Sequence, residues 1–400
     1  MPYPRHVYVH VPFCARRCSY CDFSIAVRAA VPVDEYIGSV RRELAIRYPV
    51  EAPISAGDPD PRTRLPGGPR ALTADLKREW PVETLYLGGG TPSRLGAAGV
   101  TRLLACLRSH MTLEPNAEVT LEANPDDVEP DAVQAWRDAG ITRLSIGAQS
   151  FDDGVLAWMH RTHDARAIHA AVGALRDAGF TDYSLDLIFA LPTAVPRDWG
   201  RDLETAIALG PTHVSLYGLT VEPLTPLGRR RARGELDEAP EERYEADYLA
   251  AHRTLRAAGF EHYEVSNFGR PGHRARHNSA YWSDVPYAGV GPAAHEYTGS
   301  VRRWNVAPYV EWCRRLAEGL DPMGGSELLE PGSRLAEEVY LGLRTAAGLV
   351  IKHGEGRLVD PWVAAGWGTI HDGSRLVLNE RGWLRLDALA AALTHFRSHL

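Results

Sequence analysis

The sequence predicts an α/β protein, in which six βα units form a partial barrel and a smaller C-terminal α+β domain of winged-helix-like type follows. Within residues 1–285, short apolar runs rich in β-branched residues alternate with longer helical patterns, as in parallel sheets with crossover helices. Polar residues gather directly after these runs, where the strands of a barrel carry their functional groups. Within residues 286–400, helical patterns precede an alternating stretch, which predicts the second domain.

The first strand is predicted at residues 7–11, an apolar and β-branched run that ends at Pro12. Five later runs have the same character, at residues 82–87, 117–121, 143–147, 183–189 and 213–219. Because a helical pattern separates each run from the next, we expect neighbouring strands to be parallel.

Helical periodicity begins at residues 34–48, where Asp34 is expected to cap the helix. The later helices are predicted at residues 97–110, 130–139, 165–178, 198–209 and 240–258. Four of them are followed by a glycine, which is the residue that best adopts the left-handed conformation at a helix end. These glycines are Gly140, Gly179, Gly210 and Gly259.

Two regions depart from this alternation. Residues 49–70 are rich in proline, glycine and aspartate and have no period, so we expect a long loop inserted into the first domain. In the second domain we expect helices at 308–320 and 333–346, a hairpin within 375–386 that turns near 379–382, and a final helix at 387–398. This domain is expected to pack over the barrel mouth.

The composition is that of an ordinary globular protein, with a net charge of −7 at pH 7 and five cysteines in 400 residues. This charge provides no electrostatic footprint for nucleic acid. No apolar run reaches the ~18 residues of a membrane-spanning helix, and the N-terminus leaves no room for a signal peptide before the first strand. We therefore expect a cytoplasmic protein with reduced cysteines, which favours metal binding over disulfides.

Three of the cysteines follow the first predicted strand in the spacing C-x3-C-x2-C. Three thiolates suit a [4Fe–4S] cluster that keeps one iron open, so Cys14, Cys18 and Cys21 are candidate ligands. A zinc site that lacks a ligand and a chance cluster of buried cysteines are the alternatives. Cys106 and Cys313 occur in helical patterns, where burial without a functional role is expected.

The other strand ends also carry polar or glycine residues. The second strand ends in the glycine run 88–90, the third ends at Glu122, and the fifth contains Asp186. Glycine allows close approach of the backbone to a ligand, and a glutamate at a strand end can accept hydrogen bonds from ribose hydroxyls. Arg161 offers a permanent charge for a carboxylate, although its spacing alone favours a surface ion pair.

Four segments resemble the coproporphyrinogen III dehydrogenase-like branch of the radical S-adenosylmethionine (SAM) superfamily: Tyr-Val-His-Val-Pro-Phe-Cys at 8–14, Gly-Gly-Gly-Thr-Pro-Ser at 88–93, Glu-Ala-Asn-Pro at 122–125 and Ile-Gly-Ala-Gln-Ser-Phe at 146–151. The resemblance covers nearly the whole chain apart from residues 49–70, and it implies a TIM-like partial (β/α)6 barrel with a [4Fe–4S] cluster and SAM. Carried onto matching positions, it places SAM contacts at Tyr8, Gly89, Gly90, Thr91 and Glu122. It places contacts associated with a second SAM at Tyr20, Gln149, Arg161 and Asp186.

Within this branch the chain resembles the haem chaperones. Phe23 stands where the dehydrogenases have a fourth cysteine, and residues 277–282 read His-Asn-Ser-Ala-Tyr-Trp. This resemblance implies a protein that binds haem and delivers it to haem-acceptor proteins, with no catalytic residue assigned. His277 would bind the haem iron, while Tyr281 and Trp282 would pack on the porphyrin. His273 and His295 are nearby in sequence and could take its place, and a core histidine with ordinary aromatic neighbours is the other alternative.

Two further functions remain open at this point. Oxygen-independent oxidative decarboxylation of coproporphyrinogen III by a radical SAM enzyme is the rival function, and radical chemistry on an unrelated substrate is a third. The chain departs from the family pattern at Ala190, which replaces the usual glycine of a Gly-Leu-Pro turn. The family pattern therefore does not determine the backbone conformation at this position. The sequence indicates no oligomeric state.

Overall fold

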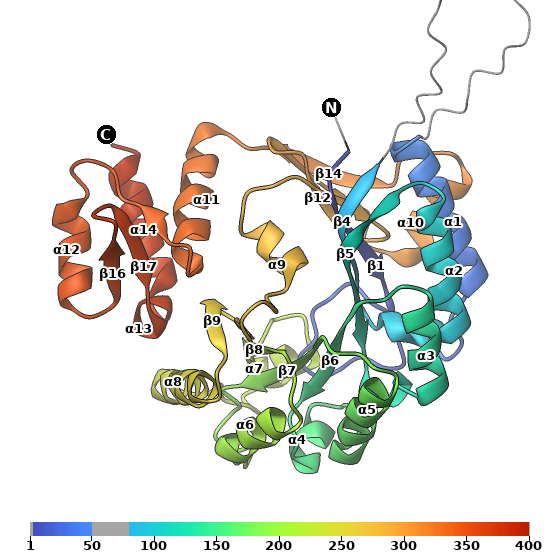
Figure 1. Cartoon of the computed structure of the whole chain (residues 1–400), viewed down its shortest axis with the longest axis horizontal. Coiled ribbons are helices and arrows are strands. Elements are labelled where there is room, and N and C mark those ends of the chain that lie inside the picture. Colours follow the sequence, from blue (N-terminus) through green and yellow to red (C-terminus); the bar gives the residue numbers. More distant parts are fainter. Residues whose placement is uncertain (1–2, 50–79, 400) are drawn as a thin grey trace, which may run out of the picture.

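The centre of the molecule is a 12-stranded sheet in the order β14-β13-β12-β11-β1-β4-β5-β6-β7-β8-β10-β9. The strands from β11 to β8 in this order are parallel, whereas the strands at both edges are antiparallel. The sheet curls without closing, so it forms a partial barrel (Figure 1). This computed structural model describes residues 3–49 and 80–399, and most of the predicted insertion lies outside the described residues.

All six predicted barrel strands form, and each pairs in parallel with the next along the chain. They are β1 (His6–Val11), β4 (Pro81–Gly89), β5 (Thr112–Ala123), β6 (Arg143–Gln149), β7 (Tyr183–Phe189) and β8 (His213–Gly218). Parallel pairing puts their C-terminal ends at the same side of the sheet, as the sequence predicts for the polar residues that follow them.

Helices cover the outer face of the barrel (Figure 1): α1 (Val33–Arg47), α2 (Gly96–Arg108), α3 (Pro130–Asp138), α5 (Ala165–Asp177), α6 (Trp199–Ala208) and α8 (Glu241–Ala257). The four glycines predicted at helix ends all have positive φ, between 65° at Gly210 and 97° at Gly140. The predicted cap at Asp34 is wrong. Helix α1 begins after Pro32, so Asp34 lies in the first turn, where its charge favours the helix dipole instead.

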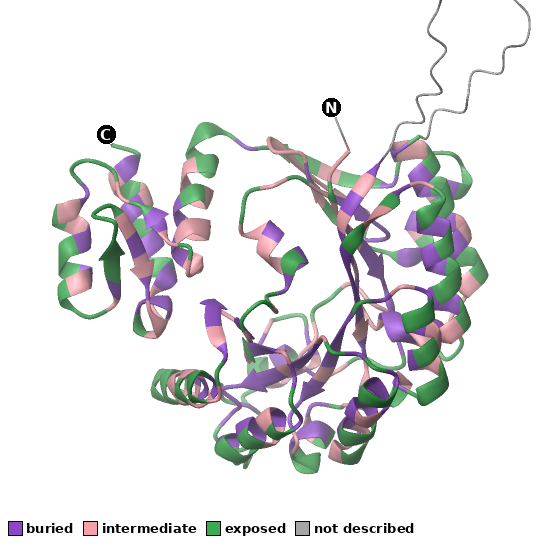
Figure 2. Ribbon diagram, viewed as in Figure 1, coloured by how far each residue is buried: buried purple, intermediate pink, exposed green. Residues whose placement is uncertain are grey.

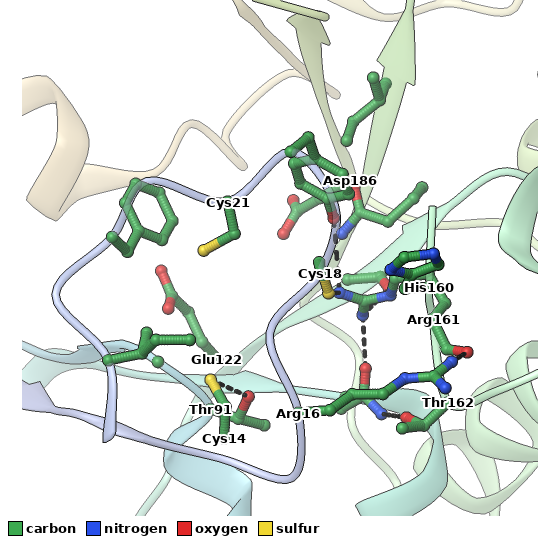
Figure 3. A pocket seen from close by; sticks show the side chains of 18 of the residues that line it. Cys14, Arg16, Cys18, Cys21, Thr91, Glu122, His160, Arg161, Thr162 and Asp186 are labelled. Carbon is green, nitrogen blue, oxygen red and sulfur yellow. Dashed lines mark hydrogen bonds between the residues drawn. The ribbon is translucent and has the colours of Figure 1, made fainter. Parts of the chain in front are cut away.

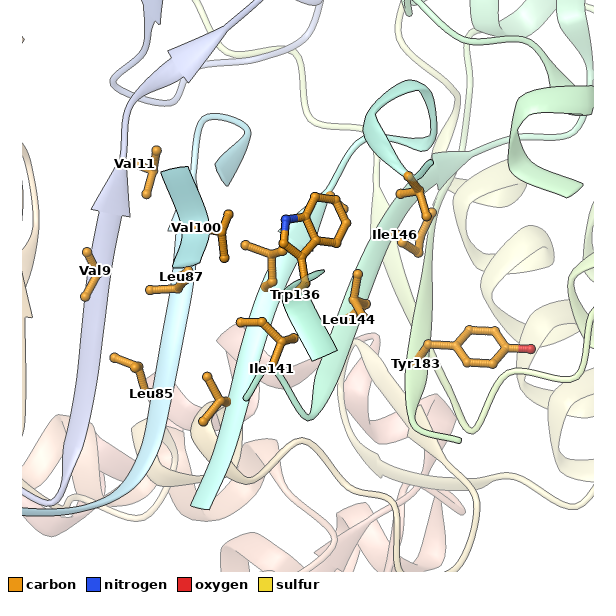
Figure 4. Close-up of a cluster of buried hydrophobic side chains, with 14 of the residues drawn as sticks. Val9, Val11, Leu85, Leu87, Val100, Trp136, Ile141, Leu144, Ile146 and Tyr183 are labelled. Atoms are coloured by element: carbon orange, nitrogen blue, oxygen red, sulfur yellow. The ribbon is translucent and has the colours of Figure 1, made fainter. Parts of the chain in front are cut away.

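The main core lies between the sheet and the outer helices (Figures 2 and 4). Val7, Val9 and Val11 of β1 are fully buried in this core with Val40 and Leu44 of α1. A Val or Leu side chain buried in this way contributes about 1.5–3 kcal/mol relative to exposure. Because strand side chains alternate between faces, the intervening residues of each strand point into the barrel, where the site is built.

Strands at both edges of the sheet extend the predicted barrel. They are β9 (Glu261–Glu264) and β10 (Asn267–Gly269) at one edge, and β11 (Tyr287–Val290), β12 (His295–Tyr297), β13 (Val301–Asn305) and β14 (Met323–Leu328) at the other. Helix α9 (Arg276–Tyr281) precedes β11, and α10 (Tyr309–Ala317) packs on α1. The sheet therefore continues to Leu328, and the predicted boundary at residue 285 does not coincide with its end.

A second hydrophobic core unites the C-terminal elements between Val339 and Leu393. The elements are α11 (Pro331–Arg344), α12 (Gly356–Ala364), α13 (Glu380–Trp383) and α14 (Leu386–Arg397), with an antiparallel sheet of β15 (Leu349–Val350), β17 (Arg375–Leu378) and β16 (Gly368–His371). This α+β content agrees with the sequence, and the winged-helix likeness stays a prediction.

The predicted hairpin turn at 379–382 is wrong. The hairpin joins β16 to β17 and turns at Asp372 and Gly373, both with positive φ. Asn379 instead caps α13, because its side chain accepts hydrogen bonds from the amides of Arg381 (3.0 Å) and Gly382 (3.1 Å).

The C-terminal unit packs against the edge strand β9 and not over the barrel mouth. The amide of Val265 donates to the carbonyl of Arg344 (3.2 Å), and the amide of Ala346 donates to the carbonyl of Tyr263 (2.9 Å). Glu264 is fully buried there and pairs with the Arg344 guanidinium at 3.0 Å. An uncovered sheet edge has unpaired backbone groups, and this contact satisfies them. Among the described helices, none is both long and apolar enough to cross a lipid bilayer.

Shorter helical segments complete the described chain: the 3-10 turns η1 (Pro92–Leu95) and η2 (Pro125–Asp127), and the helices α4 (Asp153–Trp158) and α7 (Pro226–Ala232). Each of these segments follows the C-terminal end of a barrel strand, and together they form the rim of the barrel mouth.

Candidate functional site

The cysteine loop connects β1 to α1 and closes one side of a cavity at the barrel mouth. Cys14 lies in a two-residue strand, β2 (Phe13–Cys14), which pairs in parallel with β3 (Ala26–Val27) and so holds both ends of the loop together. The cavity has a volume of about 340 Å³ and is lined by Cys14, Cys18 and Cys21 (Figure 3). The rest of its wall comes from the C-terminal ends of β4 to β8.

The thiols of Cys14 and Cys18 have different neighbours. The sulfur of Cys14 lies 3.4 Å from the Thr91 hydroxyl, and the sulfur of Cys18 accepts a hydrogen bond from Nη1 of Arg161 at 3.5 Å. Burial raises the pKa of Cys14, and it raises the pKa of Cys21 to about 11. Without a metal these two thiols stay protonated at neutral pH, and a bound metal would stabilise their thiolates.

The thiols suit a cluster better than a single ion. Within residues 3–49 and 80–399, no group of three or more His, Cys, Asp or Glu side chains is arranged to hold one metal ion. A four-iron cluster binds each thiolate through a different iron, so its ligands do not converge on one point. Three free thiols on one loop around a cavity fit such a group, and they leave its fourth iron to a ligand from the cavity.

Arg161 follows α4 and reaches into the cavity wall. Its Nη2 donates to the carbonyl of Gly147 at 2.9 Å and to the Asn124 side chain, and its Nη1 lies 3.5 Å from the Tyr20 hydroxyl. No carboxylate among the described residues forms an ion pair with it in the structure, so the surface ion pair considered from the sequence is wrong. Its charge is left for a ligand of the cavity.

Two carboxylates point into the barrel from β5 and β7, the strands on either side of β6. Glu122 accepts hydrogen bonds from the Tyr86 hydroxyl (2.7 Å) and from the amide of Gly89 (2.9 Å). Burial, with a smaller contribution from Asp186, raises the pKa of Glu122 to about 7. Asp186 is held by the Ser145 hydroxyl at 2.9 Å, and burial raises its pKa as well. Both groups are therefore poised to respond to a charged ligand.

The glycine run at the end of β4 is required by close contacts with other parts of the chain. Gly89 has φ of 113°, and a Cβ there would lie 2.5 Å from the His10 ring. A Cβ on Gly90 would lie 2.7 Å from the backbone of Pro12. The run therefore lets β4 approach the start of the cysteine loop, in addition to the ligand access expected from the sequence.

Comparison with known proteins places this geometry in a family. The profile of the radical SAM superfamily matches residues 8–206. Curated proteins named heme chaperone HemW are similar over most of their length. The protein of Mycobacterium tuberculosis is 38% identical, with 98% of this chain and 95% of the relative covered. That of Bacillus subtilis is 31% identical, with 86% and 84% covered.

The chain belongs to the HemW family. Its radical SAM domain implies a [4Fe–4S] cluster and SAM as cofactors. Among solved structures, coproporphyrinogen III oxidase (HemN) from Escherichia coli, a radical SAM enzyme, has a TM-score of 0.78, 21% identity, and coverage of 99% of this chain and 91% of that one. At this identity the likeness confirms the fold, including the partial barrel, and not the activity.

Most of the site residues predicted from the sequence line the cavity beside the cysteine loop. They are Cys14, Cys18, Tyr20, Cys21, Gly89, Gly90, Thr91, Glu122, Gln149, Arg161 and Asp186. Their strands are far apart in sequence but adjacent in the sheet, so convergence at the strand ends follows from the parallel topology. Tyr8 and His277 do not line this cavity.

Tyr8 instead lines a second cavity of about 810 Å³. This cavity lies between the β1 side of the barrel, strands β11 to β14, and the helices α9 and α11. Phe23, Gly89 and Glu122 line both cavities, so the two spaces adjoin. The segment at 277–282 contributes Tyr281 and Trp282 to this second wall.

His277 itself is a buried histidine with two side-chain partners. Its Nδ1 lies 2.7 Å from the Thr84 hydroxyl, and its Nε2 lies 2.9 Å from the Tyr281 hydroxyl. Its ring stacks on Tyr86, and burial lowers the pKa of His277 to about 3. In this arrangement neither nitrogen is free for iron, and the residue fixes the position of Tyr281.

Sequence reasoning missed three residues of the first cavity wall. Asn124 holds Arg161, Ser145 holds Asp186, and Tyr217 lines the cavity from the end of β8. Asn124 and Tyr217 each lie at the end of a predicted strand, a position that predicts a functional role in a parallel barrel. Ser145 lies inside β6, and only the alternation of side chains along the strand indicates that it faces inward.

Proposed function

We propose that this protein binds haem, a [4Fe–4S] cluster and SAM, and transfers haem to acceptor haemoproteins in the cytoplasm. The observation that carries this proposal is the similarity to proteins named heme chaperone HemW, at 31–38% identity over most of the chain. Phe23 in place of a fourth cysteine supports the chaperone over the decarboxylation of coproporphyrinogen III.

The residues have distinct roles in this proposal. Cys14, Cys18 and Cys21 would hold the cluster, which would provide a metal site for the amino acid group of SAM. Around it, Gly89, Gly90 and Thr91 supply close backbone contacts, and Glu122 accepts from the ribose hydroxyls. The second set of contacts falls on Tyr20, Gln149, Arg161 and Asp186, with Arg161 as the cation for a carboxylate. Tyr8 lines the adjoining second cavity, and Gly89 lines both cavities.

The test combines transfer and turnover. The anaerobically reconstituted protein is loaded with haem, mixed with an apo-haemoprotein, and followed by the absorbance of the product. We expect haem to appear on the acceptor, and we expect no conversion of coproporphyrinogen III in the presence of SAM and reductant. Absence of haem binding would refute the chaperone function, and steady multiple-turnover conversion would establish the decarboxylase instead.

A further inference from the structure

A row of buried polar side chains leads away from the cavity that the cysteines line. Ser184 and Asp186 of β7 and His213 of β8 point into the barrel. Between them in sequence, Leu185 and Val214 are buried in the main core on the helix side. Because Ser184 and His213 are almost fully buried, their polar atoms need partners within the protein. The direction of each hydrogen bond in the row can therefore be worked out.

The row runs from Tyr263 on β9 to Asp186 at the cavity wall. The hydroxyl of Tyr263 lies 2.8 Å from Nε2 of His213, and Nδ1 of His213 lies 2.9 Å from the hydroxyl of Ser184. Ser184 in turn donates to the carboxylate of Asp186 at 3.2 Å. Asp186 lines the cavity, whereas the other three residues do not. The row therefore connects a strand at the edge of the sheet to the ligand site through side chains.

The bond from Tyr263 fixes the tautomer of His213. The Tyr263 oxygen already accepts a hydrogen bond from the amide of Ala275 at 3.2 Å. Within the described part of the chain, its hydroxyl has no acceptor other than Nε2 of His213. Burial, with a smaller contribution from Arg143, lowers the pKa of His213 well below its ordinary value, so the ring is neutral. A neutral ring that accepts at Nε2 carries its proton on Nδ1.

From His213 onward the donors point toward the carboxylate. The Nδ1–H group donates to the oxygen of Ser184, and the hydroxyl of Ser184 donates to Asp186. Ser145 donates to the same carboxylate at 2.9 Å. Burial raises the pKa of Asp186, and the hydrogen bonds from these hydroxyls oppose that shift because they stabilise the charged form. The row therefore supports Asp186 as a charged acceptor at the cavity wall.

The other tautomer of His213 would reverse this order. With the proton on Nε2, Nδ1 becomes an acceptor, and the hydroxyl of Ser184 turns to it and away from Asp186. Asp186 then loses one donor and takes a proton more readily. A neutral acid attracts a cation less strongly than a carboxylate does, so the tautomer of His213 influences which ligands the cavity favours.

We propose that His213 is a positioning residue of the ligand site. Tyr263 locks its tautomer, and through Ser184 it holds Asp186 as a carboxylate that accepts from a cationic group of the ligand. This inference rests on the proposed function, because SAM, with its ammonium and sulfonium groups, is the cation in question. Arg161 lines the same cavity, so a cation for the carboxylate of SAM and an anion for its cationic part occupy one wall.

The first test uses Tyr263→Phe in the reconstituted full-length protein, a change that does not reach the cavity. The NMR shifts of the two ring nitrogens of His213, assigned by their absence from His213→Asn, report the tautomer. We expect Nδ1–H in wild type and a shift toward Nε2–H in Tyr263→Phe. The affinity for SAM, measured by equilibrium dialysis, should fall by roughly fivefold, because Asp186 loses a donor.

Tyr248→Phe is the matched control. Tyr248 and Tyr263 are both 4% exposed, and the hydroxyl of Tyr248 donates to the carbonyl of Val265 (3.0 Å), outside the row. This variant should keep the wild-type tautomer and SAM affinity. The affinities are compared at pH 8, where Glu122, with a pKa of about 7, is mostly ionised. The other charged or titratable groups around Asp186 are Arg143 of β6 and Tyr217 of β8.

A double-mutant cycle separates this role from a structural one. Ser184→Ala removes the donor to Asp186 and should weaken SAM binding by roughly fivefold. Adding Tyr263→Phe to this variant should cause no further loss, because Tyr263 acts on Asp186 through Ser184. This comparison and the wild-type tautomer decide the question together with the single variants.

The outcomes distinguish this inference from the proposed function. An Nε2–H tautomer in wild type, or wild-type SAM affinity in either single variant, would overturn the role of His213 and leave the proposed function standing. Additive losses in the double variant would also overturn it, since Tyr263 would then act independently of Ser184. Absence of SAM binding by the wild type would instead refute the cofactor assignment of the proposed function.

Discussion

The guanidinium of Arg161 lies against the thiol of Cys18, with 3.5 Å between Nη1 and Sγ. The two residues are 143 positions apart in sequence, and the parallel barrel brings the end of β6 beside the cysteine loop. The contact links the metal-binding loop to the cation that faces the same cavity. The roles of the two residues can therefore be distinguished by experiment. A change at Cys18 should remove the cluster, whereas a change at Arg161 should weaken the binding of SAM.

The three cysteines should be individually essential for the cluster. Replacement of Cys14, Cys18 or Cys21 by Ala removes one of only three thiolates, so we expect loss of the brown chromophore and of bound iron after anaerobic reconstitution. Cys106→Ala is the control, because Cys106 is buried in α2 and does not line the cavity. Full iron and sulfide content in Cys18→Ala would rule out this ligand set.

Arg161 should affect SAM and not the cluster. In Arg161→Met the cavity loses one of its charged donors, and a charge-assisted hydrogen bond contributes about 1.5–3 kcal/mol. We expect SAM affinity, measured by equilibrium dialysis of the reconstituted protein, to fall by roughly tenfold to a hundredfold. Arg166→Met removes an exposed arginine on α5 and should bind SAM normally. Equal SAM affinity in the two variants, with intact clusters, would exclude the role.

Much of the barrel is readable from the sequence because its strands and helices differ in period. The six central strands are buried on the helix side and most of them end near glycines or polar residues, and these local signals do not depend on distant contacts. The edge strands are different. Strand β13 contains Arg302 and Arg303, and β14 begins with Met323 followed by two glycines, so neither has an apolar pattern.

The residues of the site also divide into those that local sequence signals predict and those that depend on distant contacts. Residues at strand ends are predicted correctly as neighbours, because parallel topology alone brings them together. The partners of a given side chain depend on long-range packing. His277 looks like a free ligand in the sequence, yet Thr84, 193 positions away, bonds one of its nitrogens. His295 carries no motif signal, and its exposure to a cavity emerges only from the pairing of β12 with β13.

Ala190 provides a test of local strain. It follows β7 with φ of 56°, a conformation that costs an L-residue about 1–2 kcal/mol. Ala190→Gly relieves this cost but loses a buried methyl group. It also increases the entropy of the unfolded chain, which lowers the free energy of unfolding by about 0.4–1 kcal/mol. These effects oppose each other, so we expect the free energy of unfolding in urea to change by less than about 1 kcal/mol.

The matched control for Ala190 is Ala171, which is equally buried but lies inside α5. There the glycine relieves no strain, so Ala171→Gly should lose about 1 kcal/mol of helix propensity in addition to its methyl contact. Equal destabilisation of the two variants would mean that the positive φ at Ala190 carries no cost.

Glu122 should make stability depend on pH. Burial raises its folded-state pKa to about 7 from an ordinary value of 4.5, so the unfolded chain ionises first as the pH rises. Stability associated with the protonated carboxyl is present below pH 4.5 and is lost as the pH rises through about 7. In Glu122→Gln no proton is released, so the variant should gain about 2 kcal/mol relative to wild type between pH 5.5 and pH 8. About 1.5 pH units separate pH 5.5 from the folded-state pKa of about 7, and each unit corresponds to about 1.4 kcal/mol. Urea unfolding of the cluster-free protein at both pH values measures this difference, with Glu204→Gln on the exposed face of α6 as a control that should parallel wild type. A constant offset between Glu122→Gln and wild type across this range would show that the carboxyl of Glu122 does not titrate there.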